Sequence, residues 1–247
     1  MARILLIETA TARLSVALAK DAAVVERRVC DQPRQQASLT APLVKEVLDS
    51  QGLRMADCDA VAVSSGPGSY TGLRVGVSTA KGLCFGAGLP LIAIGTLDIL
   101  AADPSSPSAP QDDNSHCERK ENDCHSERSE ESFIVPMIDA RRMEVYTAVY
   151  GPHGQRITPV EAKVIDAQSF AEYLEQGPVL FIGDGALKCK DILPHPNARF
   201  EQAWPDAAAM APLAEKAYQE KRFEDLAYFE PFYLKDFVAT VSRKQLF

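Results

Sequence analysis

The first part of the chain alternates short apolar runs with amphipathic segments. The apolar run 4–7 and the alternating segments 14–18 and 22–29 predict three strands that follow one another in hairpins. A helix that stops at Gly52 is expected next, because apolar residues recur on one of its sides at helical spacing. These apolar residues are Leu39, Leu43, Val44, Val47 and Leu48.

The strongest local pattern begins with the apolar run 60–63, which predicts a buried strand. A loop rich in glycine, proline and serine follows, and a helical pattern then continues to residues 86–88. Within the loop, Gly66 and Gly68 are expected to adopt backbone angles that a side chain would forbid, with Pro67 between them. Ser69 or Thr71 is expected to cap the helix by accepting a hydrogen bond from an unpartnered backbone amide.

The helix predicted after this loop carries glycines in its interior. Each interior glycine costs about 1 kcal/mol relative to alanine, so their retention indicates a smooth face on which another backbone packs closely. Two interpretations stay open: a helix packed inside its own domain, or a face that meets another subunit. The small residues are Gly72, Gly76 and Ala80, which recur every four residues, followed by Gly82 and Gly86, with Leu73 and Val77 on a neighbouring apolar stripe.

A strand, a glycine turn and a helix N-terminus also form a natural anion site, so phosphate binding at this loop stays open as an alternative. The known phosphate-loop patterns do not match. The Walker pattern fails because Leu73 follows Gly72, and the dinucleotide fingerprint fails because Thr71 stands where a third glycine is required. The hydrolase elbow fails because Ser69 lies one place early.

The rest of the chain repeats this plan after an interruption. A strand at 90–94 and a helix at 96–102 close the first part, and a second hairpin-rich unit begins at residue 133. Two related α/β halves are therefore expected. The domains are a first lobe 1–102, an insertion 103–132, a smaller second lobe 133–205, and a C-terminal helix and tail 206–247 that packs back on the first lobe. In the second unit the predicted strands are 133–138, 144–150, 160–165 and 179–182, the turn is 139–142, and the helices are 168–175 and one around 210–217.

The segment 103–132 is rich in Pro, Ser, Asp, Glu and Asn and has almost no large apolar residue. It cannot bury enough apolar surface to offset its ordering entropy, so a disordered surface insertion is expected. Its two Cys and two His stand as the near-repeats 116–117 and 124–125. This arrangement differs from the spacing of structural zinc sites, so an inserted, tolerated loop is favoured over a metal site.

Composition narrows the functional class. The chain has 247 residues, 46% of them hydrophobic, and a formal net charge of −8. Such an acidic chain is a poor candidate to hold nucleic acid alone, because that affinity comes largely from cations on phosphates. The short apolar run at the N-terminus matches neither a signal peptide nor a membrane span, so a cytoplasmic protein with no membrane partner is expected. The six cysteines are then expected to be reduced.

Several motifs together resemble the TsaB (YeaZ) family, and the likeness spans nearly the whole chain outside the insertion. The resemblance implies an α/β fold of the actin/Hsp70/sugar-kinase-like (ASKHA) class. It also implies a non-catalytic partner in making N6-threonylcarbamoyladenosine (t6A) at position 37 of ANN-decoding tRNAs. The motifs are IETA at 7–10, SGPGSYTGLRVG at 65–76, AKG at 80–82, IDARRMEVY at 138–146 and YLK at 233–235.

The resemblance further implies partners and an interface. The catalytic partner is the paralogous TsaD, the ATPase TsaE joins them, and tRNA is met only through the complex. The two helices of the first lobe are implied to build a four-helix bundle with the same helices of TsaD, and in isolation the same face can pair with a second copy. The implied interface residues are Leu39, Leu43 and Val47 on one helix, and Gly72, Leu73, Gly76, Val77 and Ala80 on the other.

No reactive centre is expected in this chain. The catalytic paralogue carries a His-x-x-x-His pair on the helix after the strand 91–94, and Thr96 and Leu100 occupy the matching positions here. Neither side chain replaces imidazole as a metal ligand, so no metal, cofactor or catalytic residue is expected.

Three positions match phosphate loops of the fold class and are expected to be vestigial: Glu8, Thr9 and Asp139. For Asp139 the other interpretation is a residue that caps its own turn. An ATP-dependent phosphotransferase of the same fold is the main functional alternative. A peptidase using Ser69 is a third hypothesis, although no motif pairs that serine with a base.

Overall fold

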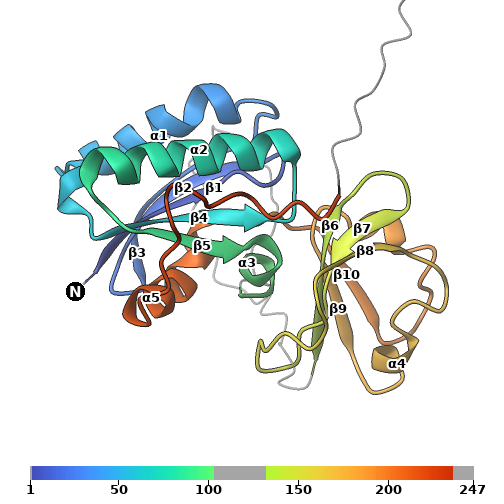
Figure 1. Ribbon diagram of the computed structural model, residues 1–247. Coiled ribbons are helices and arrows are strands. Elements are labelled where there is room, and N and C mark those ends of the chain that lie inside the picture. Colours follow the sequence, from blue (N-terminus) through green and yellow to red (C-terminus); the bar gives the residue numbers. More distant parts are fainter. Residues whose placement is uncertain (1, 103–131, 236–247) are drawn as a thin grey trace, which may run out of the picture.

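The computed structural model describes residues 2–102 and 132–235, which form two α/β lobes (Figure 1). The first lobe is built on a five-stranded sheet of order β3-β2-β1-β4-β5. Strands β1, β2 and β3 pair antiparallel, whereas β1, β4 and β5 pair parallel. The strands are β1 Arg3–Glu8, β2 Leu14–Lys20, β3 Ala23–Cys30, β4 Ala60–Gly66 and β5 Leu91–Gly95.

Both faces of the sheet are buried at β1 and β4, which explains the continuous apolar runs in these two strands. Leu5 and Ile7 face a core shared with helices α1 (Gln36–Ser50) and α2 (Tyr70–Ala87). Ile4 and Leu6 face a second core, shared with the 3₁₀ helix η3 (Ala207–Met210) and helix α5 (Ala211–Gln219). Figure 1 shows α1 and α2 side by side on one face of the sheet and α5 on the other.

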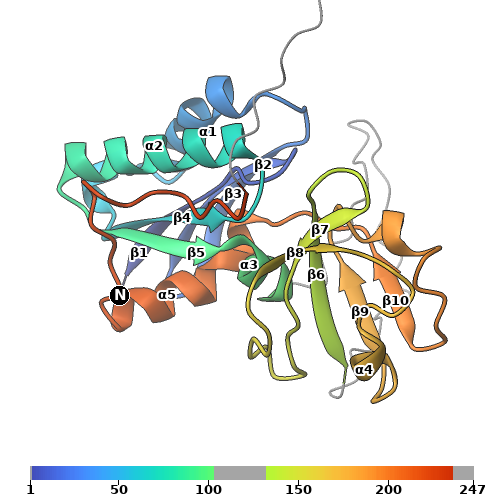
Figure 2. The same cartoon turned by 45° about the vertical axis from the view of Figure 1, so that its right-hand side comes forward.

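The second lobe repeats the plan of the first. Its sheet has the order β10-β9-β6-β7-β8, with β6, β7 and β8 antiparallel and β6, β9 and β10 parallel (Figure 2). The two related halves expected from the sequence are therefore confirmed. The strands are β6 Phe133–Asp139, β7 Glu144–Thr147, β8 Glu161–Val164, β9 Val179–Ile182 and β10 Ala198–Glu201, with helix α4 Ala171–Leu174 and the 3₁₀ helix η2 Leu187–Cys189.

Helix α3 (Thr96–Ala102) packs against both lobes. Its Leu97 and Leu100 lie in a core cluster with Ile134 and Ile182 of the second sheet. The remaining short element of the first lobe is the 3₁₀ helix η1 (Met55–Asp57), which precedes β4. Among the residues described, no helix has the length and apolar character needed to cross a membrane.

Three details of the second lobe differ from the sequence prediction. The helix predicted at 168–175 is shortened to α4, because Phe170 adopts a left-handed backbone with φ of 63° at its start. Strand β7 ends at Thr147, before the predicted end at Tyr150. Strand β10 was not predicted, since it is a short edge strand without an apolar run. Apart from Ser132, the insertion 103–132 lies outside the described residues.

The C-terminal segment returns to the first lobe after α5. Glu224 pairs with Leu91 at the edge of the first sheet, and the amide of Phe232 donates to the carbonyl of Ser65 at 2.7 Å. Lys235 then forms an ion pair with Glu144 of the second lobe. The segment thus contacts both lobes, and Figure 2 shows it running beneath α2 toward the second sheet.

Candidate functional site

The loop after β4 needs glycine at two positions for different reasons. Gly66 has a φ of +110°, as expected, and a Cβ there would lie 2.7 Å from the carbonyl oxygen of Phe232. Gly68 was expected to need an unusual backbone angle, and this is wrong, because its φ lies outside the left-handed region. It needs glycine because a Cβ would lie less than 3.0 Å from the carbonyl oxygen of Ala10.

Ser69 caps α2, one of the two candidates that the sequence offered. Its hydroxyl oxygen accepts a hydrogen bond from the amide of Gly72 at 3.3 Å. This bond satisfies one of the amides that a helix leaves unpartnered in its first turn. Thr71 lies within that first turn and is exposed. The hydroxyl of Ser69 therefore serves the helix, which removes support for its use as a nucleophile.

The glycine face of α2 packs inside its own lobe. A Cβ at Gly72 would lie less than 3.0 Å from the carbonyl oxygen of Thr9, and one at Gly76 equally close to the Thr9 hydroxyl. That hydroxyl donates to the carbonyl of Gly72 at 2.9 Å. Of the two interpretations left open by the sequence, the structure supports the helix packed in its own domain.

This packing corrects the residues expected at the subunit interface. All but one of them are buried in the chain itself and so present no free face to another subunit. Leu39 is half-buried and packs against the same core. The apolar stripe points toward the sheet because the sheet is the large apolar surface available to it. The buried residues are Leu43, Val47, Gly72, Leu73, Gly76, Val77 and Ala80.

The opposite side of α2 has a different character. Phe85 is 84% exposed, which is unusual for a large aromatic side chain. Gly82 and Gly86 flank it, and an added Cβ at either would meet nothing within 4 Å. Neither glycine has a positive φ, so neither the backbone nor the local packing of the described chain requires it. We call Ser78, Gly82, Phe85 and Gly86 the outer face of α2.

Sequence reasoning missed Phe85, although the pattern held a signal. The apolar stripe of α2 runs through Leu73, Val77, Ala80 and Cys84, which are all buried. Residues one position apart on a helix point about 100° apart, so Phe85 falls off this stripe. A large aromatic residue outside the core stripe of a helix is therefore the feature to look for.

The side chains at the positions matched to phosphate loops are buried or hydrogen-bonded within their own lobes. Glu8 and Thr9 are fully buried, and a carboxylate oxygen of Glu8 accepts from the amide of Ala10. Burial raises the pKa of Glu8 to about 7, since its charged form loses hydration. The carboxylate of Asp139 accepts from the amide of Arg141 at 2.9 Å and pairs with Lys188, so it caps its own turn.

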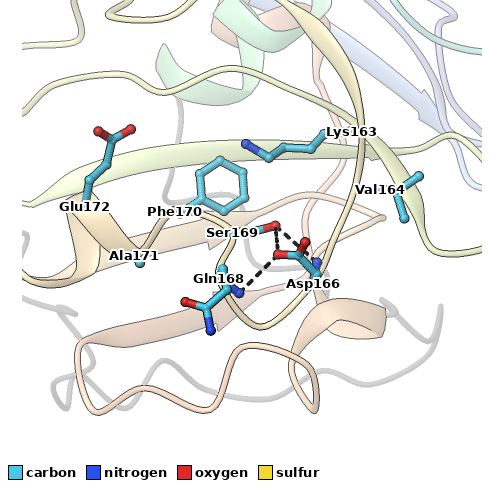
Figure 3. A pocket seen from close by; sticks show the side chains of 8 residues that line it. All are labelled: Lys163, Val164, Asp166, Gln168, Ser169, Phe170, Ala171 and Glu172. Carbon is cyan, nitrogen blue, oxygen red and sulfur yellow. Dashed lines mark hydrogen bonds between the residues drawn. The ribbon is translucent and has the colours of Figure 1, made fainter.

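A shallow pocket of about 390 Å³ lies in the second lobe beside β8 (Figure 3). Several of its polar groups are bound to one another. The hydroxyl of Ser169 donates to the carboxylate of Asp166 at 2.8 Å, and the amide of Gln168 donates to the same carboxylate at 3.0 Å. The ammonium of Lys163 lies 4.7 Å from the ring centroid of Phe170. These contacts stabilise the turn beside the pocket.

Within the described ranges, no group of three His, Cys, Asp or Glu side chains is arranged to hold a metal ion. Thr96 and Leu100, at the positions of the paralogue's histidine pair, are buried in α3. The His and Cys near-repeats of the insertion lie outside the described residues. Cys30, Cys58, Cys84 and Cys189 are free thiols.

The same strand plan repeated in two α/β lobes is that of the ASKHA fold class. The family model for the tRNA N6-adenosine threonylcarbamoyltransferase TsaD matches residues 32–113. The tRNA threonylcarbamoyladenosine biosynthesis protein TsaB of Escherichia coli K12 is 30% identical over 249 residues, which covers 96% of each chain. This chain therefore belongs to the TsaB (YeaZ) family.

Two further comparisons agree with this assignment. The solved structure of YeaZ from Pseudomonas aeruginosa covers 95% of this chain and 100% of its own, with a TM-score of 0.76 and 24% identity, which shows the shared fold. The tRNA N6-adenosine threonylcarbamoyltransferase of Sphingopyxis alaskensis is 42% identical over 71 residues, or 29% of this chain and 21% of that one. The likeness to the transferase is thus confined to a part of the chain.

Proposed function

We propose that this chain is a non-catalytic subunit that binds and activates a TsaD-type catalytic paralogue in the N6-threonylcarbamoylation of adenosine 37 of ANN-decoding tRNAs. The observation that carries the proposal is the outer face of α2, where exposed Phe85 stands between two glycines that nothing in the described chain requires. Family membership supports the choice of reaction, and this surface supports the proposed association with the paralogue.

The outer face has the chemistry of a helix–helix contact. Interior glycines cost helix stability, so their presence at Gly82 and Gly86 is explained by the close approach of a partner backbone. An exposed aromatic side chain at the centre of such a face is a typical binding hot spot. The proposal thus keeps α1 and α2 as the interface layer and moves the contact from the buried side of α2 to its exposed side.

The reaction itself is assigned to the partner. The positions of the paralogue's metal-binding histidines carry Thr96 and Leu100, whose side chains cannot replace imidazole. We infer a cytoplasmic complex that also includes a TsaE-type ATPase and that supplies the tRNA site. In the absence of the paralogue, the outer face of one copy can pair with that of a second copy as a homodimer.

Replacing Phe85 by aspartate tests this function. The variant is expected to bind the TsaD-type paralogue at least about thirtyfold more weakly, because an aromatic hot spot contributes about 2 kcal/mol or more to association. The dissociation constant would be measured by titration calorimetry, and assembly by size-exclusion chromatography. Folding is expected to be unchanged, since Phe85 is exposed.

Val164→Asp is the matched control, because Val164 is also an exposed apolar residue, at 66%, but lies on edge strand β8 of the second lobe. Its affinity for the paralogue is expected to equal that of the wild type. Unchanged binding by the Phe85→Asp variant would contradict the proposed interface. Failure of the wild-type chain to support tRNA threonylcarbamoylation by the paralogue would contradict the proposed activation.

A further inference from the structure

The turn between β6 and β7 presents two consecutive arginines in an unusual backbone conformation. Arg141 has a φ of 70° and Arg142 a φ of 53°, in the left-handed region that non-glycine residues rarely occupy. Such strain persists only where the surroundings hold it, and it is often found at functional positions. Two points therefore need an explanation: what holds the backbone of this turn, and what its two arginine side chains bind.

Lys188 supplies the support. Its ammonium donates to the carbonyl of Arg142 at 2.9 Å and to the carbonyl of Glu144 at 2.8 Å, and it also pairs with Asp139. The carboxylate of Asp139 in turn accepts from the amide of Arg141. The charge of Lys188 is thereby used inside the turn, and the backbone of the two arginines is held in place.

The two guanidinium groups themselves are not used in this way. Arg141 and Arg142 are both exposed, and across residues 2–102 and 132–235 their side chains make no hydrogen bond or ion pair. The neighbouring lysines do have ion-pair partners: Lys188 pairs with Asp139, and Lys235 pairs with Glu144. Within the described residues, the turn thus presents two positive charges without an ion-pair partner, on a chain whose net charge is −8.

Contacts through the C-terminal segment extend this charged turn toward the first lobe. Lys235, paired with Glu144, lies 5.9 Å from the ring centroid of Tyr146. Two residues earlier, the ring of Tyr233 lies 4.9 Å from that of Tyr70 at the start of α2. Figure 1 shows this end of the C-terminal segment between α2 and the β6–β7 side of the second lobe.

Tyr70 also carries a cation above its ring. The guanidinium of Arg74 lies 5.3 Å from the ring centroid, and within the described part of the chain Arg74 has no carboxylate partner. Tyr70, Arg74 and Tyr233 line an open groove of about 330 Å³. We call Arg74, Arg141, Arg142, Tyr70 and Tyr233 the cationic strip.

We propose that the cationic strip contacts the phosphodiester backbone of the tRNA while the assembled complex holds it. Arginine forks fit phosphate oxygens, and the rings of Tyr70 and Tyr233 offer stacking faces for unpaired bases. The alternative ligand is an acidic protein surface. It would pair with the arginines, but it would give no role to the tyrosine rings and the groove that they line. The inference rests on the proposed function and adds to it a direct role for this chain in holding the substrate.

The residues of the cationic strip that the experiment substitutes lie apart from the outer face of α2. Arg141 and Arg142 belong to the second lobe, whereas Phe85 is eleven residues beyond Arg74, or about 16 Å along the helix. Substitutions at the turn therefore address tRNA contact without touching the proposed protein interface. The acidic character of the whole chain explains why the isolated subunit is expected to bind tRNA weakly.

The test uses the complex of this chain with its TsaD-type paralogue and an ANN-decoding tRNA transcript. Wild-type assembly is measured first by size-exclusion chromatography and reports on the proposed function alone. The variant Arg141→Ala/Arg142→Ala is then expected to assemble normally and to bind tRNA at least tenfold more weakly by fluorescence anisotropy. The slope of log affinity against log salt is expected to fall by about 1.5, since each lost phosphate contact removes about 0.7–0.9.

Two further variants make the outcome decisive. Arg141→Asn/Arg142→Gly removes the same charges with residues that favour positive φ, so it is expected to fold at least as well and to lose the same affinity. Arg199→Ala/Lys216→Ala removes two exposed cations on β10 and α5 and is expected to leave tRNA binding unchanged. Unchanged tRNA affinity of both turn variants would overturn the proposal. Loss of assembly with the paralogue would also overturn it, because the arginines would then contact protein.

Discussion

A Gly72→Ala variant is expected to unfold at markedly lower denaturant concentration than the wild type. The added Cβ would lie less than 3.0 Å from the carbonyl oxygen of Thr9, a backbone atom of a fully buried residue. Thr9 is also held against the helix, because its hydroxyl donates to the carbonyl of Gly72. The two backbones therefore cannot separate without breaking this bond. Overpacking of this kind costs about 1–3 kcal/mol or more of the free energy of unfolding.

Gly82→Ala is the matched control, because it makes the same substitution on the same helix where nothing lies within 4 Å. It is expected to raise the free energy of unfolding by up to about 1 kcal/mol, the difference in helix propensity. Urea titrations followed by circular dichroism give both values. Equal effects of the two substitutions would show that the two sides of α2 do not differ in packing as described.

The second large effect is a pH dependence of stability that originates at Glu8. Burial raises the pKa of this carboxyl group from 4.5 to about 7 in the folded chain. The folded state therefore binds a proton more tightly than the unfolded state. The corresponding stabilisation is fully present below pH 4.5 and is lost as pH rises to 7, amounting to about 3 kcal/mol at about 1.4 kcal/mol per pKa unit.

Glu8→Gln isolates this contribution, because the amide has nearly the same shape and does not ionise. Relative to the wild type, the variant is expected to gain stability at pH 8 and to show little gain at pH 4.5. The comparison matters because burial also raises the pKa of Asp184, to about 6, which adds a dependence of the same sign. Parallel stability profiles of the two proteins between pH 4.5 and 8 would contradict the assignment to Glu8.

Much of the fold could be predicted from local patterns. The apolar runs placed β1, β4 and β9 and the spacing of apolar residues placed α1 and α2, because both patterns reflect burial of one face or two. The second lobe was predicted less well where local signals conflict with tertiary constraints. Phe170 adopts a left-handed angle that its residue type does not indicate, and β10 is a strand only because β9 lies beside it.

At the candidate site, too, the sequence predicted the local features, whereas the contacts between distant residues could be seen only in the structure. The periodicity of α2 correctly indicated that its small residues allow a close approach, by a backbone at Gly72 and by a side chain at Gly76, but it could not say which residue approaches. The residue that meets both glycines is Thr9, 63 residues away from Gly72 in the chain. The arginines of the turn at 141–142 were likewise within a recognised motif, yet their left-handed angles are visible only in three dimensions.

The amino-acid sequence by itself determined the two-lobed plan, the loop that begins α2 and the family to which the chain belongs, since these depend on local patterns and motifs. Only the tertiary structure decided which side of α2 is core and which is free. The reason is physical: a helical stripe of small residues records that something packs against it, whereas the identity of the packing partner depends on contacts between residues far apart in the chain. Here the sheet and Thr9 take one side, and Phe85 with its neighbouring glycines is left on the other.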